Sequence, residues 1–359
     1  MILKNISPYI ALDEIIIEDS PKYVHFITHF DQAFIVPNDW HSIIYTSRYI
    51  ADLLIAKKTP IPPRFLKVIT ENESQSITLP NRKTIAARMF SNDQFFGNAM
   101  FYFESTKSKT LYTGPFVTSR PILLNEYFRD CILSEIDDLY IDNEKAHSTS
   151  YESLESVADR ISDILREHPG YSMILNTFVY GYEDLICLLA KDYGCKVFVG
   201  SLIYGIFEKY KVDNIFTNRS EEADIIVGEA RVTAKHLKRR ITDKRLTVNF
   251  VKSTVEQEYL KDLGIYFINW TPHPSLFELR AFIDFVKPAN VYGIYGDTPT
   301  LPECLTGLCR RKPPIGADTE SISNVGKNHG SINMLLPFSE ANGRSRLNIL
   351  SLKSARTKK

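Results

Sequence analysis

The stretch Val24-His25-Phe26-Ile27-Thr28-His29-Phe30 is an apolar run that predicts a buried β-strand ending in a threonine, a histidine and a phenylalanine. A histidine at a strand end is a candidate metal ligand, and Asp31, two residues after His29, offers a carboxylate. Ala33 and Phe34 follow, and neither side chain can hold a metal or lower the pKa of a metal-bound water. The stretch and the residues after it therefore offer one histidine and one carboxylate as candidate ligands, and no further ligand up to Phe34.

Length and composition are those of a soluble globular protein, with 359 residues, 44% apolar and 24% charged. A chain of this length is expected to fold as two lobes. The formal net charge is zero, so no overall basic field indicates a nucleic-acid binder, although local patches can contact phosphates. The sequence has no uninterrupted apolar run of about 18 residues, so a membrane span is not expected. The N-terminus lacks the charged and apolar regions of a signal peptide.

The cysteines favour reduced, mostly buried thiols in an intracellular protein, because their number is odd and no CxxC pair is present. They are Cys131, Cys187, Cys195, Cys304 and Cys309. The last two have no histidine at a spacing that predicts a zinc knuckle. The sequence also lacks a P-loop, a GxGxxG motif and a serine nucleophile elbow.

The first 130 or so residues are rich in predicted strands. Short apolar runs between turn signals predict strands over Tyr9–Leu12, Tyr23–Ile27, Ala33–Val36, Lys67–Thr70, Ser76–Leu79 and Lys83–Phe90. Ala99–Phe103 and Thr110–Thr113 predict a hairpin. The spacing of His41–Lys57 predicts a helix, with Asp39-Trp40-His41 as its turn and N-cap.

The pattern changes after Asp138 to alternating strands and helices. Predicted strands cover Leu139–Ile141, Met173–Val179, Lys196–Val199, Ala223–Val227 and Thr247–Val251, and predicted helices cover Ser150–Glu167 and Glu183–Tyr193. This order predicts parallel strands joined by helices, and Gly194 ends the second helix. A strand at Ile265–Trp270, a helix at Ser275–Val286 and a strand at Val291–Ile294 follow.

Five stretches in this order resemble the β-CASP branch of the metallo-β-lactamase-fold nucleases, the Artemis and DNA cross-link repair group. They are Phe26–Phe30, Ile43–Leu54, Gly97–Phe103, Leu111–Phe116, and Trp270–Ser275 with the helix ending at Lys287-Pro288. The resemblance covers about residues 9–300 at low identity. It implies that Ile43–Leu54 is a strand followed by a helix.

The resemblance implies an α/β fold, a metallo-β-lactamase αββα sandwich with an inserted β-CASP α/β lobe. We expect the sandwich to use residues 1–150 and 263–335, the inserted lobe residues 151–262, and a basic, disordered tail residues 336–359. The polar and basic composition from Ser339 onward supports the tail.

The resemblance also implies that most metal ligands are lost. In the family, a ligand run His-x-His-x-Asp-His begins at the position of His29. Its second histidine falls on Asp31, its aspartate on Ala33 and its last histidine on Phe34. The next family histidine falls near Gln94 or Phe95, and the bridging aspartate falls on Pro115, which has neither a carboxylate nor an N–H.

The vestigial site positions are His29, Asp31, Asp142 and His273. We expect His29 and His273 to be buried, hydrogen-bonded histidines, and Asp142 to cap a loop, with one weakly held metal as the alternative. No catalytic residue, metal or cofactor is assigned.

Clustered basic residues are candidates for phosphate or nuclear-import contacts, with a solvated helix face as the other interpretation. They are Lys235, Lys238, Arg239, Arg240, Lys244 and Arg245, and Arg356, Lys358 and Lys359 in the tail. Direct DNA binding is expected to be at most weak and salt-sensitive.

The functional expectation is a nuclear pseudo-nuclease, not an enzyme, that acts as a scaffold or adaptor in DNA double-strand-break repair by non-homologous end joining. Its expected partners are end-joining proteins, either the ligase complex or end-binding factors. No membrane association is expected. One alternative is an active nuclease with a rebuilt mononuclear site. Another is the inactive β-CASP subunit of an RNA 3′-end processing complex.

Overall fold

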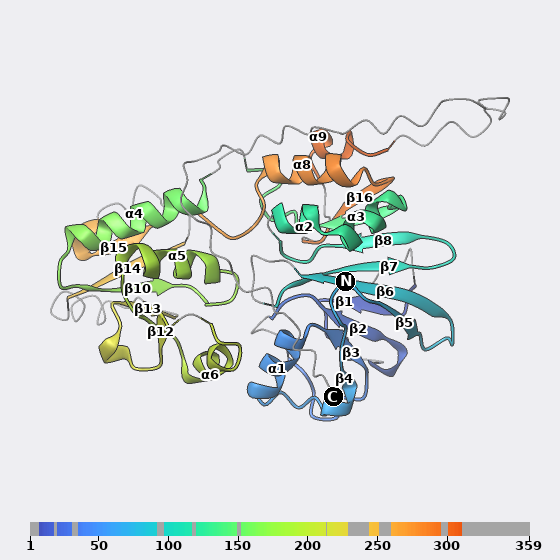
Figure 1. Cartoon of the computed structure of the whole chain (residues 1–359), viewed down its shortest axis with the longest axis horizontal. Coiled ribbons are helices and arrows are strands. Elements are labelled where there is room, and N and C mark those ends of the chain that lie inside the picture. Colours follow the sequence, from blue (N-terminus) through green and yellow to red (C-terminus); the bar gives the residue numbers. More distant parts are fainter. Residues whose placement is uncertain are drawn as a thin grey trace, which may run out of the picture. The chain divides into compact units, whose positions relative to one another are not determined.

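Three sheets carry the fold in the computed structural model (Figure 1). The structure describes residues 7–17, 20–30, 35–91, 97–116, 120–148, 152–212, 214–228, 244–250, 260–295 and 301–310. Three short 3-10 helices lie at Ser20–Lys22, Pro63–Phe65 and Ser220–Glu222.

The first sheet has four parallel strands in the order β1-β2-β3-β4. They are β1 (Ile10–Leu12), β2 (Val24–Ile27), β3 (Ile44–Thr46) and β4 (Leu66–Val68). Every residue of β1, β2 and β3 is buried. Both faces of the sheet are covered, which explains why Val24–Ile27 is apolar apart from one buried histidine.

The second sheet has six strands in the order β16-β9-β8-β7-β6-β5. They are β5 (Ser74–Thr78), β6 (Thr84–Ser91), β7 (Ala99–Glu104), β8 (Lys109–Tyr112), β9 (Asp138–Ile141) and β16 (Asn290–Gly293). Strands β5 to β8 are antiparallel, and β9 pairs in parallel with β8 and β16. The predicted hairpin of β7 and β8 is confirmed.

Aromatic rings join the two sheets face to face. The ring of Phe26 on β2 lies 5.3 Å from that of Phe101 and 4.8 Å from that of Phe103, both on β7. All three side chains are fully buried. Aromatic pairs at this spacing stabilise a core beyond the apolar area that they bury.

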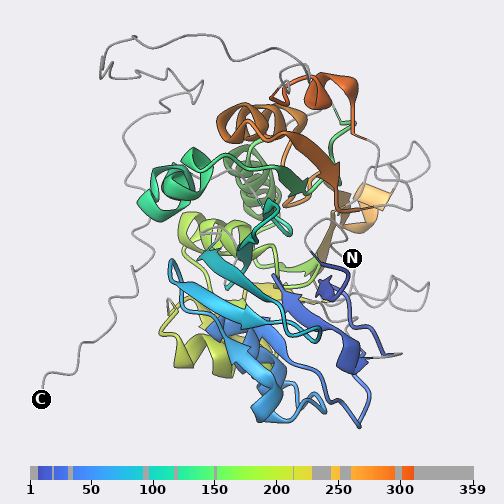
Figure 2. The same cartoon turned by 90° about the vertical axis from the view of Figure 1, so that its right-hand side faces the viewer.

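Helices cover the two outer faces of this sandwich (Figure 2). Helix α1 (Arg48–Ala56) packs with the first sheet. The second sheet is covered by α2 (Arg120–Leu124), α3 (Glu126–Leu133), α8 (Leu276–Val286) and α9 (Glu303–Thr306). The expected αββα sandwich is therefore present.

The third sheet has six parallel strands in the order β12-β11-β13-β10-β14-β15. They are β10 (Ser172–Asn176), β11 (Val197–Phe198), β12 (Phe216–Thr217), β13 (Ile225–Val227), β14 (Arg245–Asn249) and β15 (Ile265–Phe267). Its helices are α4 (Leu154–Glu167), α5 (Glu183–Tyr193) and α6 (Ser201–Lys209). The predicted parallel pairing is confirmed, and Gly194 ends α5 with a φ of 67°.

The helix predicted over His41–Lys57 is wrong in its first half. Residues Ile44–Thr46 pair with β2 and β4, so the helix begins only at Arg48. The resemblance gave the correct order of strand and helix. The N-cap is Ser47, whose hydroxyl accepts a hydrogen bond from the Ile50 N–H and donates one to the Gly97 carbonyl. Asp39-Trp40-His41 is therefore not the cap.

Two predicted strands are also too long, and a third is not a strand where it is described. Strand β10 ends at Asn176 and not at Val179, and β15 ends at Phe267 and not at Trp270. In the predicted strand Ala33–Val36, Ile35 and Val36 belong to no strand, and residues 33 and 34 lie outside the described residues. The tail predicted for residues 336–359 lies outside them as well.

No described helix is long and apolar enough to cross a membrane. All five cysteines are free thiols, and Cys131 and Cys195 are buried.

His25 on β2 is held as a neutral imidazole. Its side chain is fully buried, and burial lowers the pKa of His25 to about 4. Its Nε2 accepts a hydrogen bond from the Ile16 N–H, and its Nδ1 lies 3.1 Å from the Ser42 hydroxyl. Because Nε2 acts as an acceptor, a second proton on the ring has no place in the folded state.

We predict that the free energy of unfolding falls as pH drops from about 6.5 to about 4. The folded-state pKa lies below the unfolded value, so in this window the unfolded chain binds a proton that the folded chain does not. The loss from His25 is about 3 kcal/mol, at about 1.4 kcal/mol per pKa unit. Urea unfolding at several pH values measures it. His25→Gln should be less stable at pH 7 and should show a shallower slope; an unchanged slope would contradict the assignment.

Candidate functional site

The carboxyl ends of β1 and β2 place three polar residues together. Asp13 follows β1 with a φ of 49°, and Thr28 and His29 follow β2. The Asp13 carboxylate accepts hydrogen bonds from the Thr28 N–H at 2.7 Å and the Thr28 hydroxyl at 2.6 Å. The Nδ1 atom of His29 lies 3.0 Å from the Thr28 hydroxyl and 3.6 Å from an Asp13 oxygen. Parallel strands end at the same edge, so this meeting follows from the sheet.

Asp13 is ionised in this arrangement. Burial by itself raises the pKa of the Asp13 carboxyl, but the neighbouring His29 and the hydrogen bonds from Thr28 lower it further than burial raises it, so the net shift is downward. The carboxylate thus fixes Thr28, which in turn lies against the His29 ring.

A second carboxylate and histidine pair links β9 to the segment before α8. Asp142 follows β9 and is completely buried, and its Oδ2 lies 2.7 Å from the Nδ1 of His273. Its other oxygen accepts a hydrogen bond from the Glu144 N–H at 3.1 Å. The Asp142 N–H donates to the Thr113 hydroxyl. Asp142 therefore caps its loop and also orients a histidine.

One phenol connects the two pairs. Burial raises the pKa of Tyr112, at the end of β8, well above its usual value, and the nearby Asp13 and Asp142 carboxylates raise it further. Gly114 completes the contact with a φ of 59°, because a Cβ on it would lie 2.3 Å from the Thr28 hydroxyl. The two pairs therefore belong to one cluster where the ends of the two sheets meet.

The predicted site residues are brought together only in part. His29 and His273 are half-buried, with side chains 23% and 24% exposed, and both have carboxylate neighbours. Pro115 lies next to the cluster in sequence and is half-buried. Asp31, Ala33 and Phe34 lie outside the described residues, as do Gln94 and Phe95.

The donor set of the cluster is poor in metal ligands. Within the described ranges no group of three or more His, Cys, Asp or Glu residues could hold a metal ion. The Nδ1 atoms of His29 and His273 lie within hydrogen-bond distance of protein oxygens, so these nitrogens are already engaged. A catalytic zinc takes three protein ligands and a water, and a dinuclear centre takes more. The described residues do not fit a dinuclear centre.

Of the predicted basic residues, Lys244 and Arg245 are described. Both are exposed at the start of β14. Lys235, Lys238, Arg239, Arg240, Arg356, Lys358 and Lys359 lie outside the described residues.

Sequence reasoning missed Asp13 and Tyr112. The available signal was an aspartate directly after the apolar run Tyr9–Leu12, the same position that Thr28 holds after the next strand. Parallel neighbouring strands would have placed the two residues side by side.

Curated relatives of this chain include 5′ exonucleases, although no protein-family model matches it. It is 24% identical over 291 residues to 5′ exonuclease Apollo of Danio rerio. This match covers 80% of this chain and 50% of that protein. Apollo of Gallus gallus is 24% identical over 275 residues, 74% of this chain and 56% of that protein. Protein artemis of Danio rerio is 24% identical over 246 residues, 60% and 38% of the two chains. The chain spans about half the length of the Apollo proteins.

The fold also matches a crystallised protein of unknown function from Enterococcus faecalis V583. The TM-score is 0.50 at 12% sequence identity, and the match covers 78% of this chain and 77% of that chain. At this identity the match concerns the fold alone.

We predict that Thr28→Val lowers the free energy of unfolding by about 1–3 kcal/mol, because it leaves the buried Asp13 carboxylate with one hydrogen bond fewer. Thr110→Val is the matched control. Thr110 is also fully buried, but its hydroxyl has no hydrogen-bond partner among the described residues, so its removal should be neutral or stabilising. Urea unfolding compares the two, and equal losses would contradict the role given to Thr28.

Proposed function

We propose, from the premise that this chain is a distant homologue of the DNA repair nucleases Apollo and Artemis, that it is a nuclease-like protein of DNA repair that does not hydrolyse DNA. In this proposal the metallo-β-lactamase fold is kept as a binding surface. The protein acts in the nucleus as a scaffold or adaptor in double-strand-break repair, within non-homologous end joining. Its partners would be the ligase complex or end-binding factors.

The observation that supports the loss of activity is the donor set of the cluster. The cluster holds two imidazoles and two carboxylates, and protein groups already occupy both carboxylates: Thr28 binds Asp13, and His273 and the Glu144 N–H bind Asp142. Proline at position 115 supplies no ligand. No three of the described His, Cys, Asp or Glu residues are arranged to hold a metal ion, whereas a catalytic zinc that carries a hydroxide takes three protein ligands.

The second candidate is a nuclease with a rebuilt mononuclear site at His29, Asp31, Asp142 and His273. One observation favours it: the Nδ1 of His273 is held by the Asp142 carboxylate, and that of His29 lies against the Thr28 hydroxyl, which is bound to the Asp13 carboxylate. Second-shell partners of this kind orient metal-binding histidines in proteins.

Elemental analysis and a cleavage assay separate the two candidates. We expect the purified protein to hold less than one zinc per chain. We also expect no cleavage of end-labelled single-stranded or duplex DNA with added zinc, magnesium or manganese. Stoichiometric zinc with chelator-sensitive cleavage would contradict the proposal.

If cleavage is seen, Asp142→Asn and His273→Asn should abolish it, while Asp159→Asn should not, because Asp159 is an exposed carboxylate on α4. Cleavage retained in all three variants would indicate a contaminating nuclease, and loss in all three would indicate a general effect on folding.

Affinity capture from the protein's own cells, after digestion of nucleic acid, tests the setting. We expect end-joining proteins to be recovered with the chain. Selective recovery of RNA 3′-end processing factors would contradict the repair assignment. Direct DNA binding should be weak, with a Kd around micromolar at physiological salt, and should weaken as salt rises.

A further inference from the structure

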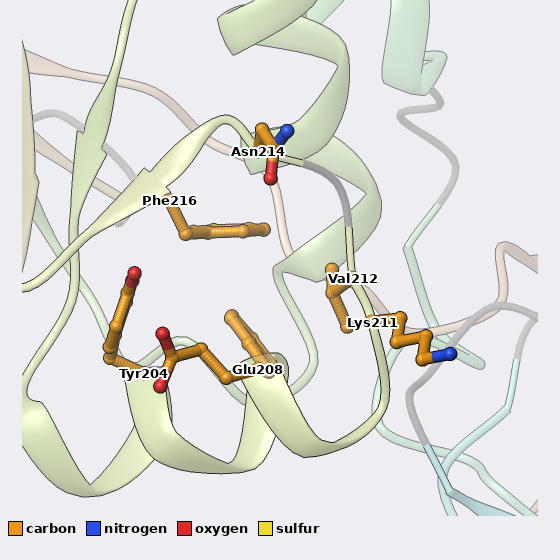
Figure 3. A pocket seen from close by; sticks show the side chains of 7 residues that line it. Tyr204, Glu208, Lys211, Val212, Asn214 and Phe216 are labelled. Carbon is orange, nitrogen blue, oxygen red and sulfur yellow. The ribbon is translucent and has the colours of Figure 1, made fainter.

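A pocket of about 350 Å³ lies between α6 and β12, on a different sheet from the histidine cluster. Its lining residues are Tyr204, Phe207, Glu208, Lys211, Val212, Asn214 and Phe216 (Figure 3). Pockets of this size lie at the lower end of those that bind small ligands. A single long side chain fits such a volume.

The floor of the pocket is aromatic and fixed. The rings of Phe207 and Phe216 lie 4.5 Å apart between centroids, and both side chains are buried. Tyr204 stands at one wall, half-buried, and Val212 lies on the other side (Figure 3). The π-faces of such rings attract cations.

A carboxylate lies among these rings. Glu208 is one helical turn after Tyr204 on α6, and its side chain lies beside the Tyr204 ring and below Phe216 (Figure 3). A hydrogen bond between the Tyr204 phenol and the Glu208 carboxylate raises the pKa of the phenol. The phenol and the carboxylate therefore lie side by side on one face of α6 (Figure 3).

The charge of this carboxylate is not balanced by a neighbouring cation in the described part of the chain. Glu222, which lies near Tyr204, is bound by Arg219 at 2.9 Å and by Lys196 at 3.7 Å. Glu208 forms no ion pair with any described residue. The Lys211 ammonium points away from the pocket (Figure 3). An anionic ligand such as a phosphate would meet Glu208 directly and is disfavoured.

We propose that this pocket binds an arginine side chain of a partner protein. The planar guanidinium would stack on the aromatic walls and donate hydrogen bonds to Glu208, a combination that the compact lysine ammonium reproduces poorly. The Asn214 side chain at the rim supplies a further carbonyl acceptor.

This inference goes beyond the proposed function and does not depend on it. The pocket uses no residue of the histidine cluster, so a metal-dependent nuclease could carry it as well. A negative result in the test of one proposal therefore leaves the other proposal unaffected.

Saturation-transfer NMR with the full chain tests the pocket. The probes are N-acetylated, C-amidated tripeptides Gly-Arg-Gly, Gly-Lys-Gly and Gly-Gln-Gly. We expect saturation of the arginine methylene protons with a Kd around millimolar, as a single side chain gives only about 4 kcal/mol. The lysine peptide should bind several-fold more weakly, and the glutamine peptide should not bind. Equal signals from arginine and glutamine peptides would overturn the proposal.

Two variants place the binding at this pocket. Glu208→Gln removes the charge of an exposed side chain and should weaken arginine binding about tenfold. Tyr204→Leu should also weaken it. Glu221→Gln, which neutralises another exposed carboxylate on the 3-10 helix at Ser220–Glu222, is the matched control and should bind as the unchanged protein does. Unaltered binding by Glu208→Gln would overturn the assignment.

Discussion

The contact between Gly114 and Thr28 is the constraint on which the histidine cluster depends. Gly114 follows the last antiparallel strand of one sheet and Thr28 follows a parallel strand of the other. Any side chain at position 114 would displace the Thr28 hydroxyl, and the φ of 59° also disfavours one. Because nothing separates the two strand ends, Thr28 can bind Asp13 while Thr113, the neighbour of Gly114, binds the Asp142 segment.

Much of this fold could be predicted from local patterns, and its failures have physical causes. The β7–β8 hairpin and helix α5 were found because each has its own periodicity and a clear end, such as Gly194 with its left-handed conformation. The helix over His41–Lys57 was extended too far because β3 has only three residues, all buried. A buried parallel strand of that length has no alternation that distinguishes it from the apolar face of a helix.

The cluster could be predicted less well than the fold. Thr28 and Asp13 are 15 residues apart, and Asp142 and His273 are 131 residues apart. No local pattern contains these pairings; they arise when parallel strands bring their ends to one edge. The resemblance identified His29, Asp142 and His273 as survivors of a metal site, but it gave no reason for their survival. The structure supplies one through the hydrogen bonds that each makes.

Retention of these residues does not require catalysis. A completely buried carboxylate such as Asp142 is costly unless it is paired, so removing His273 would leave a buried charge without its partner. The same reasoning applies to Asp13, which Thr28 and His29 keep ionised. Each carboxylate and histidine pair thus stabilises the end of the strand that its carboxylate follows, β1 for Asp13 and β9 for Asp142. A histidine in this cluster is therefore evidence for the fold and is not by itself evidence for hydrolysis.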